Sequence, residues 1–598
     1  MRSLLHKLGR PAAPADIVEE VEHNPNDKEA AVGEKSASNE SDPGAETDSS
    51  QEEISKEAQA GIQRVEAMTK VWTRNDMYMA YITIWILYFV DALQSGMSTS
   101  FYPYVTSSFY LHSLTATTSI MSSLIGGLFK LPLAKILDIW GRPQGFCAML
   151  LCLTIGLIMM AACNGVQTYA AAQVFYWVGY NGITYSISIF LADTSALKNR
   201  ALLFAFVSSP YIITCWISGI VADRFLEGPG WRWGYGAFTI IVPVVCSPLL
   251  WLFYKNHVKA KKAGLLPKHE SKGGFWPTLK YYLIEFDIFG LLLITTGLAL
   301  FLLSFNLYSY QKDQWRSPLI ICFLVFGGLL MIAFAFYEKF LAPKTFIPYT
   351  LLMDRTVLSA CILSGALFVS FYIWDIYFPS FLQVVNNLDI VKTSYVVNVY
   401  SVGSCFWSLL VGWAIRKTGR FKWLAMYFGV PVTILGVGLM IHFRQPNENV
   451  GYIVMCQIFI ATAGGTLVIC EQMAVMAATS HEFIAVVLAI EAMFSNVGGA
   501  IGLTIASAIW TGVFPKHLAK YLPASEQENL PAIYGSITTQ LSYPYGSETR
   551  NAIARAYGDS QKYMLIAATA IQAISLVSVL FWRDIKLKDV KQNKGLVF

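Results

Sequence analysis

Four acidic residues lie inside long apolar stretches of this sequence, where a charged side chain is costly. They are Asp91, Asp375, Glu471 and Glu491. A charge at the centre of a bilayer costs roughly 2.5 kcal/mol or more, so such residues are rare and usually serve a function. Low-dielectric surroundings favour the protonated form of a carboxyl group, which can then take up a proton on one side of a membrane and release it on the other.

Proton coupling is therefore the chemistry that these four acids predict. Asp91, in YFVDALQSG, and Asp375, in FYIWDIYFP, are the first choices because their sequence settings are alike. Glu471, which precedes Gln472, is the next choice. The alternative is a structural ion pair with a lysine that follows in the chain, Lys130 or Lys135.

The composition indicates a membrane protein that positions these acids on helices. Hydrophobic residues make up 55% of the 598 residues and charged residues 14%, and the mean hydropathy is +0.47. The apolar residues form blocks of about 20, the length of helix that crosses ~30 Å of hydrocarbon. We expect an all-α protein with 14 transmembrane spans, at about 77–98, 114–136, 146–164, 169–192, 201–222, 234–254, 283–304, 318–338, 356–378, 394–415, 422–442, 451–477, 484–513 and 562–582.

The distribution of Lys and Arg predicts the orientation. Residues 255–282 contain seven lysines, and basic residues are also dense in 416–422 and 583–594, whereas 99–113 and 165–168 contain none. Cytoplasmic loops carry the excess of Lys and Arg, so both termini are expected in the cytosol. That placement requires an even number of spans and excludes 13.

The chain is expected to divide into two related halves with additional segments. Residues 1–70 form an acidic tail, with 15 acidic and four basic residues between Asp16 and Glu66, and are expected to be disordered. The remaining segments are a six-helix bundle at 71–254, a basic loop at 255–282, two linker helices at 283–338, a second six-helix bundle at 339–582 that includes an external loop at 514–561, and a basic tail at 583–598.

A short motif after the second span predicts a gate. Asp138-x-x-Gly141-Arg142 places an acid at a cytosolic helix end and an arginine in a tight turn, so the two can pair across neighbouring helices. The segment that contains Arg416 and Arg420 repeats the motif in the second half. This pattern resembles the loop motif of the major facilitator superfamily. Asp193 and Arg200, after the fourth span, are similar to the 4–5 loop of its 14-span branch and complete the expected gating set.

Longer motifs resemble one family within that branch. They are Leu137-Asp-Ile-Trp-Gly-Arg-Pro-Gln-Gly145-Phe, Ser208-Ser-Pro210-Tyr211-Ile, Phe381-Leu-Gln383-Val-Val-Asn386, Leu530-Pro-Ala-Ile-Tyr534-Gly and Tyr543-Pro-Tyr545-Gly546-Ser. They are similar to the fungal siderophore–iron transporters over about residues 62–590. The resemblance implies a major facilitator fold, two pseudo-symmetric six-helix bundles plus two helices, and proton-driven uptake of ferric hydroxamate siderophores by alternating access.

Two other transport functions stay open. A proton-coupled drug exporter of the same fold is the second choice, although the fifth span lacks the Gly-Pro pair of such exporters and the fourth lacks their arginine. A glutathione-type exchanger is the third. We expect no enzyme activity and no nucleic-acid partner, because no nucleophile–base or nucleotide motif occurs. We also expect no cofactor and no metal site, because the His and Cys residues lack ligand spacing.

A bulky chelate needs a wide cavity with aromatic faces and a few amide or hydroxyl partners. The expected lining is Tyr88, Gln94, Tyr180, Asn181, Tyr185, Tyr211, Trp216, Tyr372, Trp374, Tyr377 and Gln383. Each of these aromatic residues has the alternative of simple packing. The external loop is expected to fold into a lid, with Tyr534, Tyr543 and Tyr545 as contacts. The expected location is the plasma membrane, with an endosomal membrane as the alternative, and the expected state is a monomer.

Overall fold

The computed structural model describes residues 71–108, 125–265, 275–285, 287–308, 311, 313–343 and 349–588, and these residues contain helices but no strand. The predicted acidic tail, 1–70, lies outside the described residues, as does most of the basic tail. Every backbone donor and acceptor in hydrocarbon needs a partner within the protein, and a helix provides it within one segment. Continuous apolar blocks therefore become long helices.

The helices of the first half are long and closely packed. They are α2 (Arg74–Ser108), α4 (Lys130–Ile139), α5 (Arg142–Ala162), α6 (Val166–Thr194), α7 (Leu197–Ser208), α8 (Tyr211–Glu227) and α9 (Trp231–Lys262). Helix α2 packs on α8 and α9, and α5 packs on α6 and α9. A Cβ atom on Gly179 of α6 would lie 2.3 Å from the backbone of Leu153 in α5, so glycine is needed for this close approach.

Two helices follow the first half and pack on each other: α11 (Ile288–Leu307) and α12 (Pro318–Phe340). The short helix α10 (Phe275–Glu285) precedes them. Helix α11 also contacts α20 of the second half. The side chain of Asp287 caps α11 by accepting a hydrogen bond from the backbone N–H of Gly290.

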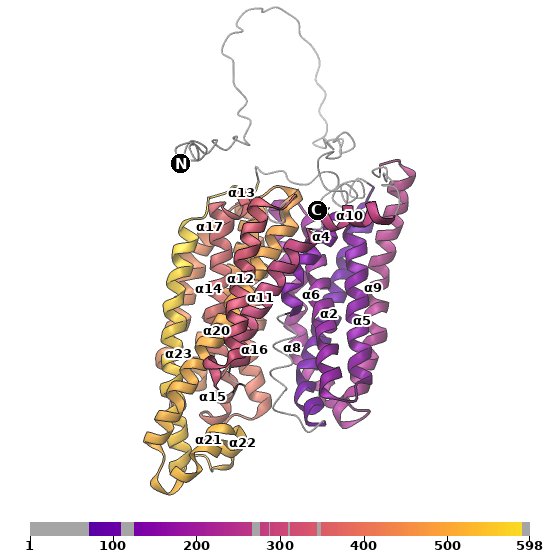
Figure 1. Ribbon diagram of the computed structural model, residues 1–598. Helices are drawn as coiled ribbons and strands as arrows, with labels where there is room; N and C mark the ends of the chain where they lie inside the picture. The colour runs from indigo at the N-terminus through magenta and orange to yellow at the C-terminus, as the bar shows by residue number, and fades with distance from the viewer. Residues whose placement is uncertain are drawn as a thin grey trace, which may run out of the picture. The chain divides into compact units, whose positions relative to one another are not determined.

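The second half contains several long helices and a number of short ones (Figure 1). They are α13 (Tyr349–Leu352), α14 (Arg355–Asp375), α15 (Phe378–Val384), α16 (Ile390–Thr418), α17 (Lys422–Leu424), α18 (Val430–Phe443), α19 (Val450–Ala477), α20 (Ile484–Tyr521), α21 (Leu530–Gly535), α22 (Ile537–Ser542) and α23 (Glu548–Leu580). Short helical turns lie at Gln314–Arg316, Ala425–Gly429, His481–Phe483 and Ala524–Asn529. Helix α14 packs on α20 and α23, and α16 packs on α19.

The two halves contact each other through five helix pairs among the described residues. Helix α7 packs on α16 and α19, α8 packs on α16, and α4 and α6 pack on α20. A Cβ atom on Gly412 of α16 would lie 2.7 Å from the backbone of Leu202 in α7. The backbones of the halves therefore meet closely at this point.

The expected spans correspond to helices, but their number is not confirmed. Eleven helices of the described residues are long and apolar enough to cross a membrane, and a shorter apolar helix covers Ile288–Ser304. The expected span 169–192 falls on α6, which is not among the eleven, and the expected span 114–136 lies partly outside the described residues. The count of 14 stays a prediction, as does the division into domains.

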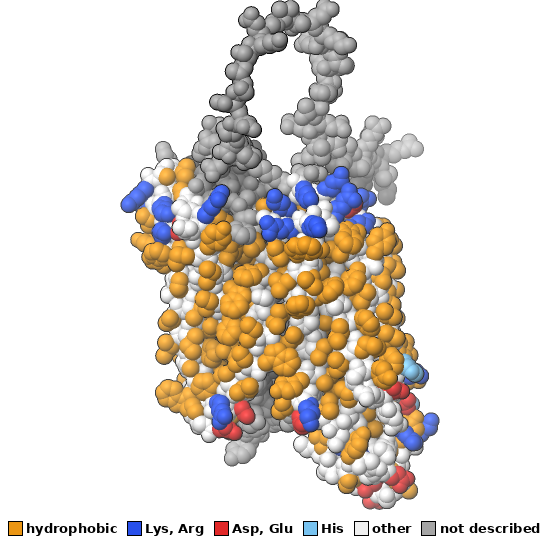
Figure 2. All heavy atoms as spheres, turned by 180° about the vertical axis from the view of Figure 1, so that it is seen from behind, with side chains coloured by type: hydrophobic (Ala, Val, Ile, Leu, Met, Phe, Trp, Pro, Cys, Tyr) orange, Lys and Arg blue, Asp and Glu red, His pale blue; other side chains and the backbone are white. Residues whose placement is uncertain are grey.

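The outer surface supports a membrane-embedded protein. Hydrophobic side chains form a broad band around the visible face, and Lys and Arg side chains gather along one edge of it (Figure 2). We call this edge the basic edge.

Candidate functional site

A cavity of about 230 Å³ lies between the two halves. The first half contributes Tyr88, Ser188 and Ser208, and the second contributes Tyr400 and Gln472, among others. Hydroxyl groups from both halves and an amide group from the second half therefore line this cavity. A movement of the halves relative to each other would widen or narrow it. We call this space the central cavity.

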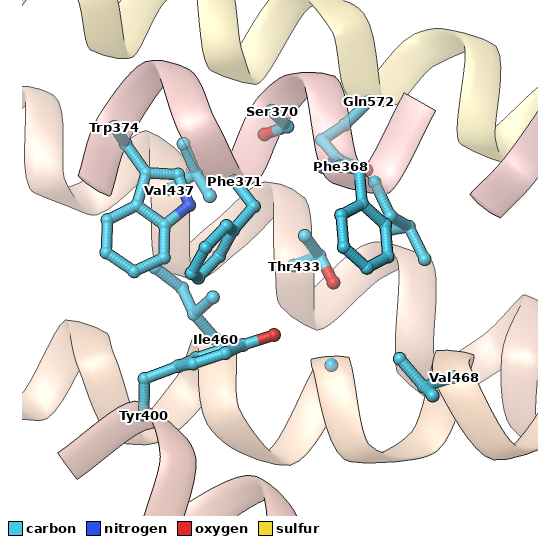
Figure 3. Close-up of a pocket in the computed structure, with 12 residues that line it drawn as sticks. Phe368, Ser370, Phe371, Trp374, Tyr400, Thr433, Val437, Ile460, Val468 and Gln572 are labelled. Carbon is cyan, nitrogen blue, oxygen red and sulfur yellow. The ribbon is translucent and has the colours of Figure 1, made fainter. Parts of the chain in front are cut away.

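A second cavity of about 150 Å³ adjoins it within the second half (Figure 3). It shares Tyr400, Gly464 and Val468 with the central cavity. The Phe371 ring lies 5.2 Å from both Trp374 and Tyr400, centroid to centroid. We call this space the aromatic cavity.

One buried amide lines the aromatic cavity. The Oε1 atom of Gln572 has no hydrogen-bond partner among the described residues. A buried amide oxygen without a partner costs free energy. A ligand that donates a hydrogen bond in the aromatic cavity would satisfy this atom.

The structure brings only part of the predicted lining to these cavities. Tyr88 lines the central cavity and Trp374 the aromatic one. The other predicted residues of the first half make internal contacts. The hydroxyl groups of Tyr180 and Tyr211 hydrogen-bond to each other at 2.8 Å, and Asn181 donates to Trp177 O at 3.0 Å. Gln94 hydrogen-bonds to Ser98 and Tyr176. Tyr185 donates to Ala485 O, across the contact between the halves.

The remaining predicted residues of the lining also face other partners. Trp216 lies 5.1 Å from Tyr395, and Tyr377 stacks on Trp510 at 4.2 Å, in both cases between ring centroids. Tyr372 packs against Gly499, and the backbone oxygen of Gln383 accepts from Arg550. None of these residues is among those that line the central or aromatic cavity.

Sequence reasoning missed Tyr400, which lines both cavities. A signal was present, because Tyr400, Ser404 and Ser408 recur every four residues along one face of the apolar helix α16, and all three line the central cavity. On α14, the lining residues Phe371 and Trp374 are likewise three positions apart.

Two of the four acids form one buried pair. Glu471 of α19 and Glu491 of α20 are 1% and 7% exposed, and their carboxyl groups hydrogen-bond to each other. Ser364 Oγ lies 3.2 Å from Glu471 Oε1, 3.1 Å from Glu491 Oε1 and 2.7 Å from Ser495 Oγ. A hydroxyl group donates one hydrogen bond at a time, so it cannot satisfy both carboxylates. Two adjacent carboxylates also repel each other, so a proton shared between Glu471 and Glu491 would stabilise the pair.

A lysine from the other half faces this carboxyl pair. Lys130, the first residue of α4, lies where its charge acts on Glu491. The contact between α4 and α20 is close here, since a Cβ atom on Gly127 would lie 2.5 Å from Asn496 Nδ2. Lys130, one of the two lysines that the sequence offers as ion-pair partners for the intramembrane acids, thus links the acid pair of one half to the other half.

Asp91 and Asp375 do not share a setting, contrary to the expectation from their sequences. Asp91 is 4% exposed and borders a small apolar space beside Val242 and Cys246 of α9. Its Oδ2 atom has no hydrogen-bond partner among the described residues. Asp375 is half-buried at the C-terminal end of α14, where the charge of Arg444 acts on it.

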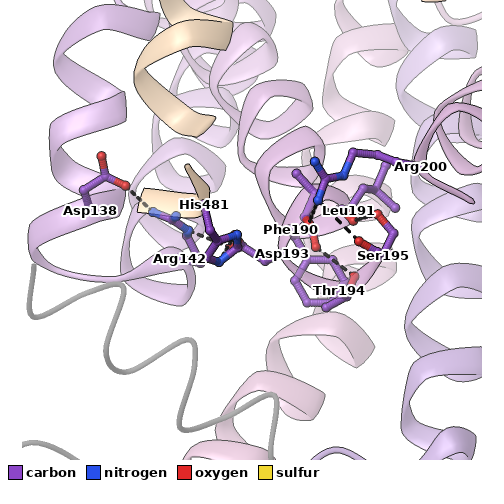
Figure 4. A network of polar contacts seen from close by, with 10 residues as sticks. Asp138, Arg142, Phe190, Leu191, Asp193, Thr194, Ser195, Arg200 and His481 are labelled. Carbon is purple, nitrogen blue, oxygen red and sulfur yellow. Dashed lines mark hydrogen bonds and ion pairs between the residues drawn. The ribbon is translucent and has the colours of Figure 1, made fainter. Parts of the chain in front are cut away.

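The predicted gate forms a buried ion-pair network (Figure 4). Arg142 Nη1 lies 2.6 Å from Asp138 Oδ1, and Arg142 Nε lies 2.9 Å from Asp193 Oδ2. Gly141, with φ of 112°, makes the turn before α5. All of these residues belong to the first half, so the arginine does not join the halves. The contact across the halves is made by His481, whose Nε2 lies 3.4 Å from Asp193 Oδ1.

The second copy of the motif makes different contacts. Arg420 Nε lies 3.8 Å from Asp584 Oδ2, and both side chains are about half exposed. Arg416 is exposed in the last turn of α16. Arg200, which is fully buried, donates from Nη2 to the backbone oxygens of Ala192 and Ser195, at the end of α6. The motif therefore repeats in sequence, but its buried network does not.

The segment predicted as an external loop, 514–561, begins within α20 and ends within α23, and residues 522–547 connect the two helices. Between α20 and α23 it contains a short helical turn and the helices α21 and α22, which pack on α20 and α15 (Figure 1). Arg550 anchors it through hydrogen bonds to the backbone oxygens of Val384, Gln383 and Gln540. We call residues 522–547 the external cap.

The three predicted contact residues of the external cap have different surroundings. Tyr534 packs near Phe514, and Tyr545 is 64% exposed. Tyr543 donates to Glu526 Oε2 at 2.8 Å. Hydrogen bonds from Asn529 and Tyr543 hold the pKa of Glu526 below its usual value.

Comparisons with known proteins identify the family. Residues 84–503 match the Major Facilitator Superfamily. The chain is 65% identical over 547 residues to "MFS siderochrome iron transporter 1" of Ajellomyces capsulatus, which covers 92% of this chain and 93% of that protein. It is 40% identical over 580 residues to "Siderophore iron transporter mirB" of Emericella nidulans, with 96% of each covered.

A solved structure supports the fold alone. A bacterial homologue of the iron transporter ferroportin, in an outward-facing state with soaked iron, aligns with a TM-score of 0.51 at 9% identity, over 84% of this chain and 98% of that one. The predicted all-α major facilitator fold is confirmed, and so is the expectation of a transporter rather than an enzyme, since the family consists of transporters. The chain belongs to the fungal siderophore–iron transporters of the major facilitator superfamily.

Proposed function

We propose that this protein imports ferric hydroxamate siderophores together with protons, by alternating access, across the fungal plasma membrane. It acts as a monomer, and an endosomal membrane is the alternative location. The names of its relatives support siderophore iron as the cargo. The cavities offer the matching chemistry, since the aromatic faces of Phe371, Trp374 and Tyr400 suit a bulky, roughly neutral chelate and the amides suit its polar groups.

The observation that carries the proton-coupling proposal is the Glu471–Glu491 pair beside Lys130. When the pair has one proton, its remaining negative charge attracts Lys130 from the other half. A second proton neutralises the pair and weakens that attraction. Proton loading is thereby connected to the contact between the halves.

Contacts between the halves support alternating access. The hydroxyl group of Tyr185 in the first half donates to Ala485 O in the second, and His481 reaches Asp193. The cavities, of about 230 and 150 Å³, are each below the roughly 300–1,000 Å³ of typical ligand pockets. A large chelate requires them to widen, which a separation of the halves would achieve.

The basic edge supports the orientation. Lys and Arg side chains gather there (Figure 2), and cytoplasmic surfaces carry this excess. In the proposed orientation the basic edge and both termini face the cytosol. The external cap then lies outside, where it covers the outer mouth of the transport path and helps to capture the chelate.

The function is tested with purified protein in liposomes and a hydroxamate siderophore loaded with radioactive iron. We expect accumulation when the lumen is electrically negative or the outside is acidic, and only equilibration when both gradients are collapsed. Equal accumulation without gradients would overturn proton coupling. Failure to move any iron chelate, with proton-driven drug movement or glutathione exchange instead, would overturn the cargo.

A further inference from the structure

A hollow on the basic edge is lined by several cations. It has a volume of about 430 Å³ and is lined by Thr418, Gly419, Arg420, Trp423, Lys586 and Lys588. We call it the basic pocket. It lies between the turn after α16 and the segment after α23, and it shares no lining residue with the central or aromatic cavity.

Backbone contacts, rather than acidic partners, bring these cations together. Gly419 adopts a left-handed conformation, with φ of 72°, and turns the chain after α16. The segment after α23 folds back over this turn, where Leu587 N donates to Gly419 O at 2.9 Å and the Leu587 side chain is buried. Lys588 Nζ donates to Lys417 O at 3.0 Å. The fold thus fixes the hollow before any ligand is present.

The charges of the basic pocket are not balanced. Arg420, Lys586 and Lys588 face one acid within ion-pair distance among the described residues, Asp584, which is 3.8 Å from Arg420 and half exposed. Two positive charges are therefore left without an acidic partner in the part of the chain that the structure describes. Like charges held close together repel, so an anion with two charges would relieve the repulsion. A phosphomonoester carries about 1.5 to 2 negative charges at neutral pH.

The surroundings point to a lipid as the source of that anion. Trp413, Trp423 and Tyr427 are 57%, 41% and 73% exposed near the same helix ends. Exposed Trp and Tyr residues mark the level of the lipid headgroups. Basic pockets beside transmembrane helices on the cytosolic side suit phosphorylated inositol headgroups. The basic pocket, with its volume of about 430 Å³, is also larger than a single phosphate group.

We propose that the basic pocket binds the phosphomonoester headgroup of a membrane lipid, with Arg420, Lys586 and Lys588 as ligands and Thr418 as an additional hydrogen-bond donor. This proposal is independent of the cargo and of proton coupling. It gives Arg420, a residue of the predicted gate, a role in lipid binding.

The test measures binding of short-chain phosphatidylinositol bisphosphate to the purified full-length protein by native mass spectrometry and by the shift in thermal unfolding. Short-chain phosphatidylinositol, which lacks a phosphomonoester, is the comparison lipid. The triple variant Arg420→Gln/Lys586→Gln/Lys588→Gln removes the three cations. The matched control, Lys261→Gln/Lys262→Gln/Lys280→Gln, removes three exposed lysines that lie outside the basic pocket.

We expect the bisphosphate lipid to bind at least 10-fold more tightly than phosphatidylinositol, and the pocket variant to lose this preference while the control retains it. Equal weakening by both triple variants would overturn the proposal, because general surface charge would then explain binding. Equal binding of the two lipids by the unaltered protein would overturn it as well. Inositol trisphosphate binding as tightly as the lipid would support the phosphomonoester site but assign it to a soluble ligand.

Discussion

Replacing Glu471 by Gln is the sharpest test of the proton-coupling proposal. The amide has nearly the volume of the carboxyl group and can still hydrogen-bond to Ser364 and Glu491, which lie beside it. It cannot exchange a proton. We therefore expect Glu471→Gln to fold and to carry the chelate, but without coupling to the proton gradient.

The expected size of the effect follows from the pair. Under the proposed coupling, Glu471 and Glu491 hold one proton between them throughout and the pair exchanges one further proton in each cycle. One positive charge that moves inward gains about 2.3 kcal/mol per 100 mV. Since about 1.36 kcal/mol corresponds to a factor of ten, a roughly neutral chelate should accumulate about 50-fold per coupled proton. Glu471→Gln should lose this factor.

The assay uses liposomes with a potassium diffusion potential of about 100 mV, lumen negative, at equal pH on both sides. The accumulation ratio of the radioactive chelate is measured at the plateau. Exchange of chelate at zero potential reports whether the variant still completes the transport movement. The control is Glu227→Gln, a surface side chain that is 65% exposed, and it should accumulate chelate as the unaltered protein does.

Two results would refute this reasoning. If Glu471→Gln reaches the same accumulation ratio as the unaltered protein, the pair does not carry the coupled proton. Alternatively, a correctly folded variant that loses exchange as well would show that Glu471 is needed for the transport movement itself. A second coupled acid would raise the ratio of the unaltered protein by another factor of about 50, but it would not remove the loss in the variant.

Three other changes test the remaining parts of the site. Asp91→Asn preserves the shape of a buried side chain, so the protein should reach the membrane while the dependence of uptake on external pH becomes weaker; unchanged dependence over a series of pH values would exclude a role for Asp91. Arg142→Gln leaves two buried carboxylates without their arginine, and the unfolding free energy in denaturant should fall by about 3–5 kcal/mol, whereas no measurable fall would contradict a stabilising network. Replacing residues 522–547 with a Gly/Ser linker should raise the apparent KM for the chelate with little change in maximal rate, and identical kinetics would argue against a capturing role for the external cap.

The apolar blocks of the sequence determined the helices to within a few residues in several places. The expected span 451–477 matches α19 (Val450–Ala477), and the expected span 146–164 overlaps α5 (Arg142–Ala162). The reason is physical: hydrocarbon requires each crossing segment to satisfy its own backbone, so length and hydropathy suffice. The sequence also identified the acids, because a carboxylate is conspicuous in an apolar block, and it identified the family through its motifs.

The rotation and pairing of the helices were decided by the tertiary structure. Helices that are apolar on all sides carry little information about which face turns inward. Of the predicted residues on α14, Trp374 therefore lines a cavity whereas Tyr372 does not, and Tyr400 of α16 was missed. The sequence does not predict that Glu471 of α19 contacts Glu491 of α20, or that Lys130 of the other half lies beside them. Both contacts depend on how the helices pack on one another. For the same reason, Asp91 and Asp375 look equivalent in sequence but lie in different surroundings: the neighbours of a side chain come from other helices, and hydropathy along one helix does not encode them.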